Sequence, residues 1–185
     1  MIKLIDNISK RFWLWLIFFL SAILINIVFL FKIDDIIKEK SGFSIYDTSP
    51  LADKESLILR TPFLAQNAIK EIDLFYLWDT IFVLLFSVSM ATALAFGLRQ
   101  LRKEQYEVGK FNFLLCLPII AMLIDFTENI LGLYLVHNCP PVSANAINLM
   151  WVVRIFKLCS MVVVVGCLII ALAGVFKYFK CKEIK

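Results

Sequence analysis

Long apolar runs, separated by shorter stretches that hold most of the charged residues, dominate the hydrophobic pattern of the chain. A helix that crosses a hydrocarbon core of about 30 Å needs roughly 20 consecutive apolar residues. Four runs meet this requirement, and they predict an all-α polytopic membrane protein built as a four-helix transmembrane bundle. The predicted spans are residues 12–31, 74–98, 111–136 and 149–176.

The connection between the first two spans, residues 32–73, is too long for a structureless loop in a compact protein. Ser49–Pro50 and Thr61–Pro62 each combine a hydroxyl side chain that can cap a helix with a proline suited to the first helical position. We therefore expect an outer helical cap, with a helix over residues 63–78 that runs into the second span. Filling the membrane interface is the simpler role of this cap, and acting as a lid is the alternative.

The composition supports a membrane protein and excludes several other classes. Hydrophobic residues make up 61% of the 185 residues, charged residues only 18%, and the mean hydropathy is +0.85. Soluble globular domains are about 45–50% apolar and about 25% charged, so one small core cannot hold this excess. A cytosolic enzyme, a nucleic-acid-binding module and a secreted disulfide scaffold are excluded, and residues 1–185 are expected to form a single membrane domain.

The distribution of basic residues predicts the orientation. Eleven of the 19 Lys and Arg residues lie before the first span, between residues 99 and 110, or in the C-terminal tail. Because cytoplasmic segments of membrane proteins are enriched in Lys and Arg, both termini should be cytoplasmic and residues 32–73 should face outward. We expect a multi-pass protein of the cell (inner) membrane. Its net charge of +4 indicates contact with anionic membrane lipids and no nucleic-acid partner.

Cysteine and histidine provide little chemistry in this chain. Of the five cysteines, only Cys139 is predicted to face outward, so no disulfide can close within the chain on that side. His137 is the only histidine, which excludes His-rich metal sites. There is no glycine-rich phosphate loop and no H-E-x-x-H motif. We expect no metal and no cofactor.

Ionisable residues inside the predicted spans are the most informative feature of the sequence. Such a residue costs at least ~2.5–3.5 kcal/mol at the centre of a membrane helix, so it usually faces a partner or a cavity. At 1.5 Å per residue, all of them lie roughly 8–16 Å from the outer ends of their helices. The sequence therefore predicts one charged site in the outer half of the bilayer. Its members are Asp79, Asp125, Glu128, Arg154 and Lys157.

Helical spacing places these residues on three faces that can meet. Asp125, Glu128 and Asn129 share one face of the third span, and Arg154 and Lys157 share one face of the fourth. Two carboxylates one turn apart need not both ionise, which is typical of acid–base pairs. Asp125, Glu128 and Lys157 are therefore the catalytic candidates if the protein is an enzyme, a question that the sequence leaves open.

Three functional hypotheses fit this site. The first is the binding or conversion of a lipid-like amphiphile, whose polar head meets the charged residues while Phe82, Phe86 and Met161 line its tail. The second is an accessory or structural protein whose ion pairs only order the helices or dock a partner, with Arg154 extending to the interface. The third is a small proton- or ion-coupled carrier, which is ranked last because the chain has no internal repeat. Homo-oligomerisation stays open.

The order of these residues resembles an uncharacterised group of small prokaryotic four-span integral membrane proteins. The likeness consists of Asp79 at the head of the second span, Asp-x-x-Glu-Asn at residues 125–129 and Phe156-Lys157 early in the fourth span. It covers most of the chain in topology but rests on about five residues. The resemblance implies that these side chains belong together and implies no reaction. A weaker resemblance is to the sterol-isomerase and sigma-2-receptor type family, whose acidic spacing and depth differ.

Overall fold

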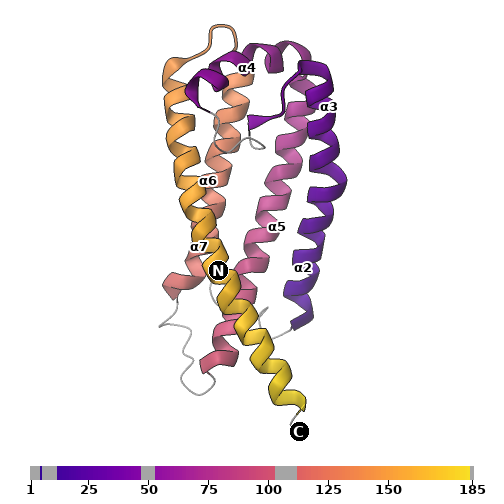
Figure 1. Ribbon diagram of the computed structural model, residues 1–185, viewed down its shortest axis with the longest axis vertical. Coiled ribbons are helices and arrows are strands. Elements are labelled where there is room, and N and C mark those ends of the chain that lie inside the picture. The colour runs from indigo at the N-terminus through magenta and orange to yellow at the C-terminus, as the bar shows by residue number, and fades with distance from the viewer. Residues whose placement is uncertain (1–4, 6–11, 47–52, 103–111, 184–185) are drawn as a thin grey trace. The chain divides into compact units, whose positions relative to one another are not determined.

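The computed structural model describes residue 5 and residues 12–46, 53–102 and 112–183, and every element in these ranges is a helix (Figure 1). The all-α fold predicted from the sequence is confirmed. The elements are α2 (Phe12–Ile25), the π-helix η1 (Asn26–Leu30), α3 (Phe31–Ser41), α4 (Lys54–Asn67), α5 (Ile69–Arg102), α6 (Asn112–His137) and α7 (Ala144–Glu183).

Four of the helical stretches in the described ranges are long and apolar enough to cross a membrane, which confirms the prediction of a bundle with four such helices. They are Trp13–Ser41, Ile69–Leu101, Phe113–His137 and Ala144–Phe179. The first, second and fourth of these stretches are longer than the spans predicted from the apolar runs. A helix ends where its backbone hydrogen bonding ends and not where its side chains become polar. The first stretch ends at Gly42, whose left-handed φ of +80° suits glycine.

The predicted start of the cap helix at Thr61–Pro62 is wrong. Helix α4 begins at Lys54, and the Asp53 side chain caps it by accepting a hydrogen bond from the Ser56 backbone N–H at 2.7 Å. The Thr61 hydroxyl instead donates to the Leu57 carbonyl inside the helix, and Pro62 is an interior residue. A second signal, at Ser49–Pro50, lies outside the described residues.

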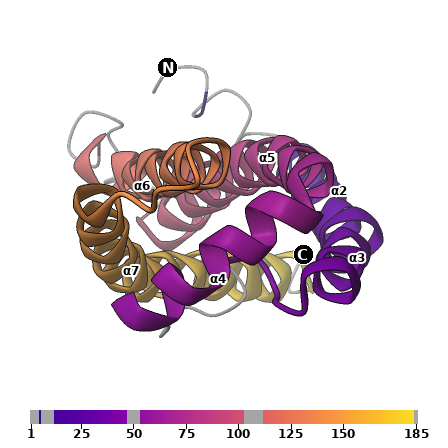
Figure 2. The ribbon, with the colours of Figure 1, turned by 90° about the horizontal axis from the view of Figure 1, so that it is seen from above.

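A continuous helix over residues 63–78 is also contradicted. Ala68, with φ −139° and ψ 21°, separates α4 from α5. The chain changes direction between the two helices at Ala68. The buried Ala68 backbone N–H still has an acceptor there, because it donates to the Leu64 carbonyl at 3.1 Å. Figure 2 shows the result, with α4 lying across the neighbouring helices instead of continuing the line of α5.

Residue contacts divide the chain into two compact units, each of which is described separately. The cap unit comprises residues 23–83 and 123–158, and the terminal unit comprises residues 1–22, 84–122 and 159–185. Helices α5, α6 and α7 contribute one segment to each unit.

The core of the cap unit lies between α4 and the segments of α3, α5, α6 and α7 that belong to this unit. One face of α4 is fully buried through Leu57, Thr61 and Leu64, because side chains three or four residues apart share one side of a helix. The Lys54 ammonium lies 4.9 Å from the centre of the Trp151 ring, which ties the first turn of α4 to α7. The aliphatic and aromatic residues that complete this core include Ile33, Ile37, Ile72, Tyr76, Leu135, Ile147 and Met150.

The terminal unit contains a close helix crossing between α5 and α7. A methyl group built on Gly97 would lie 2.7 Å from the Ala171 Cα atom, and one built on Gly174 would overlap the Gly97 backbone. The two backbones therefore touch without intervening side chains, as at small-residue crossings in membrane helices. The Lys177 ammonium also donates to the Leu101 carbonyl at 2.8 Å, near the C-terminus of α5.

This crossing gives a test of the terminal unit. Gly174→Ala should lower the free energy of unfolding by about 1–3 kcal/mol, because the new methyl group forces α5 and α7 apart. Gly166→Ala is the matched control in the same helix, since a methyl group there would have no neighbour within 4 Å. Thermal melting in detergent measures both variants. Equal melting temperatures would contradict the close crossing.

Candidate functional site: a buried charged network

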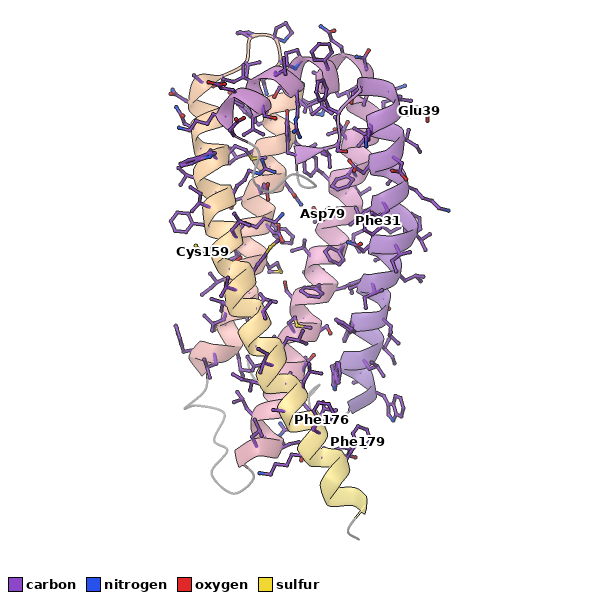
Figure 3. All side chains as sticks on the ribbon, in the orientation of Figure 1. Phe31, Glu39, Asp79, Cys159, Phe176 and Phe179 are labelled. Carbon is purple, nitrogen blue, oxygen red and sulfur yellow. The ribbon has the colours of Figure 1, made fainter. Side chains whose placement is uncertain are left out.

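The charged residues predicted from the sequence come together inside the cap unit. Helix α6 contributes Asp125, Glu128 and Asn129 from one face, because residues at i, i+3 and i+4 lie on the same side of a helix. Helix α7 contributes Arg154 and Lys157 by the same spacing. Asp79 comes from α5 and is only 7% exposed (Figure 3).

Arg154 and Glu128 form the innermost ion pair. The Arg154 Nε atom donates to Glu128 Oε1 at 3.0 Å, and the two side chains are only 4% and 2% exposed. The Nη2 atom of the same guanidinium donates to the backbone carbonyl of Tyr46. Arg154 therefore does not extend to the membrane interface, and the sequence-based alternative that it does so is wrong. A guanidinium has five N–H donors, so one side chain can satisfy a carboxylate and a carbonyl together.

Lys157 joins the two carboxylates of α6. Its Nζ atom lies 2.5 Å from Asp125 Oδ1 and 2.7 Å from Glu128 Oε2. The sequence-based prediction that Lys157 shares one site with Asp125 and Glu128 is confirmed by these two contacts. Glu128 is thus held by two cations. The outer members of the network remain partly accessible, with the Lys157 side chain 15% exposed and the Asp125 side chain 23% exposed.

Asp79 and Asn129 connect α5 to the same face of α6. The Asn129 amide donates from Nδ2 to Asp79 Oδ2 at 2.7 Å, which orients the amide because a carboxylate can only accept. The Asn129 Oδ1 atom then points elsewhere, and it accepts no hydrogen bond from any described residue although Asn129 is only 2% exposed. One turn further along α6, Gly132 lets the Tyr76 hydroxyl approach the backbone, since a Cβ atom there would overlap it.

The three predicted apolar lining residues, Phe82, Phe86 and Met161, are divided between the two units. Phe82 is partly buried against the core of the cap unit. Phe86 and Met161 belong to the terminal unit, where Phe86 contacts the Phe19 ring at a centroid distance of 6.3 Å and Met161 is 47% exposed. Of these three residues, only Phe82 therefore shares a unit with the charged network.

The structure also adds groups that the sequence analysis missed. The Tyr46 carbonyl belongs to the network, but a backbone carbonyl carries no signal in a sequence. The Tyr46 side chain is fully buried and its hydroxyl lies 2.7 Å from Thr61 Oγ1. Burial raises the pKa of the Tyr46 phenol to about 12, so this side chain is a neutral hydrogen-bonding group. Tyr76 could have been identified from the sequence as a neighbour of the network, because it lies one helical turn before Asp79 on the same face of α5.

The arrangement suits polar recognition better than metal binding. Within the described ranges, no group of three or more His, Cys, Asp or Glu side chains could hold a metal ion. The network instead offers carboxylates, an ammonium and a guanidinium, with one accessible edge and one unused amide oxygen. Such groups can hold a charged or hydrogen-bonding headgroup, and two neighbouring carboxylates can exchange a proton.

No family model matches the chain, and no curated protein or solved structure shows significant similarity to it. The resemblance to small four-span membrane proteins therefore stays a prediction, and the functional argument rests on the geometry of the network.

Proposed function

We propose that this protein binds a lipid-like amphiphile through the accessible edge of the charged network, with the polar headgroup at Asp125 and Lys157. The observation that carries the proposal is the gradient of exposure across the network. Glu128 and Arg154 are closed off, whereas a carboxylate and an ammonium remain partly accessible on two helices that can span a membrane. Partly exposed ionisable groups are costly in hydrocarbon, so this edge is better stabilised by a polar headgroup than by lipid tails.

Two further features support a headgroup at this place. Asn129 Oδ1, on the turn of α6 that follows Asp125, offers a buried acceptor that a ligand donor could satisfy. The residue next to Lys157, Phe156, is 59% exposed and provides apolar surface for a hydrocarbon tail. A molecule with a polar head and an apolar tail meets both requirements. Whether the protein also converts this molecule depends on a proton exchange that Asp125 and Glu128 could support.

Neutral variants of the accessible edge test this function. In Asp125→Asn/Lys157→Gln, both charges are removed together and the Glu128–Arg154 pair stays in place, so the protein should still fold. Native mass spectrometry of protein purified in mild detergent should show an amphiphile on the wild type and its loss from this variant. Asp35→Asn/Lys32→Gln, which changes two exposed residues of α3, is the control and should retain it. Retention of the same molecule by both variants would refute the proposal.

We also propose that the protein lies in the cell (inner) membrane with both termini cytoplasmic, which places the charged network in the outer half of the bilayer. The support comes from the basic residues at both ends and between residues 99 and 110. In this orientation the accessible edge meets the outer leaflet, and α4 lies at the outer surface.

Cysteine labelling tests the orientation. In a variant with Cys139 and Cys181 replaced by serine, Glu39→Cys should react with a membrane-impermeant thiol reagent in intact cells, because Glu39 is exposed at the end of α3 (Figure 3). Gln100→Cys in the same background should react only after the cells are permeabilised. The opposite pattern would reverse the orientation.

A structural function is the second candidate, and one observation favours it. Arg154 uses the same guanidinium to pair with Glu128 and to hold the Tyr46 carbonyl, so the network connects the cap to α6 and α7. If ordering were its only role, the neutral edge variant would retain both its fold and every bound molecule of the wild type.

A further inference from the structure

A short strap, residues 43–46, joins α3 to the charged network. The strap follows the C-terminus of α3, and its last two residues, Ile45 and Tyr46, are fully buried. Segments without regular secondary structure usually run over the surface, because their backbone groups need water as a partner. Here the described part of the connection turns into the interior of the cap unit, so protein groups must replace the water.

Two charged side chains, one from α3 and one from α7, supply these partners. Asp34 of α3 accepts a hydrogen bond from the Ile45 backbone N–H at 2.8 Å through Oδ1. Arg154 of α7 donates to the carbonyl of the next residue, Tyr46. The backbone at Ile45 and Tyr46 is therefore held between a carboxylate on α3 and a guanidinium on α7. Hydrogen bonds to charged groups are stronger than those between neutral groups.

The strap is also tied to α4 and to its own start. The Tyr46 hydroxyl lies 2.7 Å from Thr61 Oγ1, in the middle of α4. At the other end, Ser41 Oγ donates to the Phe43 carbonyl at 2.9 Å and accepts from the Phe43 N–H at 3.2 Å. Arg154 of the charged network thus helps to hold the strap in place beside α4. The contacts are hydrogen bonds, which can break and form again, and none of them is a covalent link.

We infer that the strap is a latched lid, which closes Glu128 and Arg154 from the side of α4 and uses Asp34 and Arg154 as its two latches. With the strap in place, Glu128 is 1% exposed and Arg154 is 4% exposed. Displacing the strap would remove the Tyr46 backbone from Arg154 and open a path from the α4 surface to Glu128. An amphiphile could approach Asp125 and Lys157 independently of the strap, so this inference stands apart from the proposed function.

The latch at α3 gives the first experiment. In full-length protein in lipid nanodiscs, Asp34→Ala should raise amide hydrogen exchange in residues 43–46 by at least roughly tenfold, the effect of losing one charge-assisted hydrogen bond. Asp35→Ala is the matched control, because Asp35 is the neighbouring carboxylate and is exposed. No difference between the two variants would overturn the latch.

Glu128 reports whether the strap closes the network. A water-soluble carbodiimide with an amine nucleophile should label Glu128 several-fold faster in Asp34→Ala than in Asp35→Ala, because the first variant leaves Glu128 and its two cations unchanged. Faster exchange in the strap without faster labelling of Glu128 would overturn its role as a lid. If Asp34→Ala does not fold, Tyr46→Phe releases the tie to Thr61 and should produce the same two changes, in smaller amount; their absence would likewise overturn the lid.

The latch at α7 gives a separate comparison. Arg154→Met removes the donor to the Tyr46 carbonyl, whereas Lys157→Met disturbs the same network at Asp125 and Glu128. Hydrogen exchange in residues 43–46 should therefore rise more in Arg154→Met than in Lys157→Met, when both are measured under conditions where the rest of the protein stays protected. Equal exchange would show that the strap responds only to general destabilisation, and the latch would be refuted.

Discussion

Arg154→Met should lower the free energy of unfolding by about 3–5 kcal/mol, because it leaves a buried carboxylate without its guanidinium partner. The Glu128 side chain is only 2% exposed and cannot regain water when Arg154 is lost. The Tyr46 carbonyl loses its donor in the same substitution. Methionine is unbranched and can fill much of the same space, so the loss reflects charge and hydrogen bonding more than packing. The melting temperature in detergent should fall by on the order of 10 °C.

Two further variants control this measurement. Arg60→Met makes the same chemical change at a partly exposed position of α4 and should alter stability by less than about 0.5 kcal/mol. Arg154→Met combined with Glu128→Gln should recover part of the loss, because a buried neutral amide costs less than a buried carboxylate. If Arg154→Met and Arg60→Met had the same melting temperature, the buried Arg154–Glu128 pair would contribute nothing to the stability of the fold.

Lys157→Met should produce the second largest loss, about 3 kcal/mol. Its Nζ atom pairs with both Asp125 and Glu128, but Arg154 still balances Glu128 after the substitution. Asp125 then loses the ammonium that lies 2.5 Å from its Oδ1 atom. Since the Asp125 side chain is 23% exposed, the loss should be smaller than for Arg154→Met. Lys70→Met, at an exposed position of α5, is the control.

The choice of rescue mutation distinguishes the two carboxylates. Asp125→Asn should restore more stability to Lys157→Met than Glu128→Gln does, because the latter removes the buried carboxylate that pairs with the Arg154 guanidinium. Thermal melting of the two double variants measures the difference. A larger recovery with Glu128→Gln would mean that Lys157, and not Arg154, is the main partner of Glu128.

Several parts of this structure follow from the sequence because they depend only on helix geometry. An apolar run of about 20 residues cannot be buried in a small soluble core, so the four spans were predictable from hydrophobicity. The rise of 1.5 Å per residue sets depth along each helix, which put Lys157 level with Glu128 before any contact was known. The spacing of 3.6 residues per turn likewise placed Asp125, Glu128 and Asn129 on one face.

The cap shows where local signals fail. Thr61–Pro62 is a good sequence signal for a helix start, yet the Thr61 hydroxyl bonds within α4 and contacts Tyr46, and the helix begins at the Asp53 cap. Propensity contributes about 1 kcal/mol at such a position, and tertiary packing easily outweighs it.

The sequence by itself therefore determined the four helices that are long and apolar enough to cross a membrane, the residues of the charged network and the level along the helices at which acidic and basic side chains meet, because these depend on regular distances along one helix. Only the tertiary structure decided that Arg154 turns inward to Tyr46, that Asn129 binds Asp79, and that the Ile45 backbone N–H donates to Asp34. Each of these contacts joins residues at least 50 positions apart or involves a backbone group. These contacts depend on how far each helix is rotated about its axis and on the path of the connecting chain. The periodicity of the sequence sets neither of them.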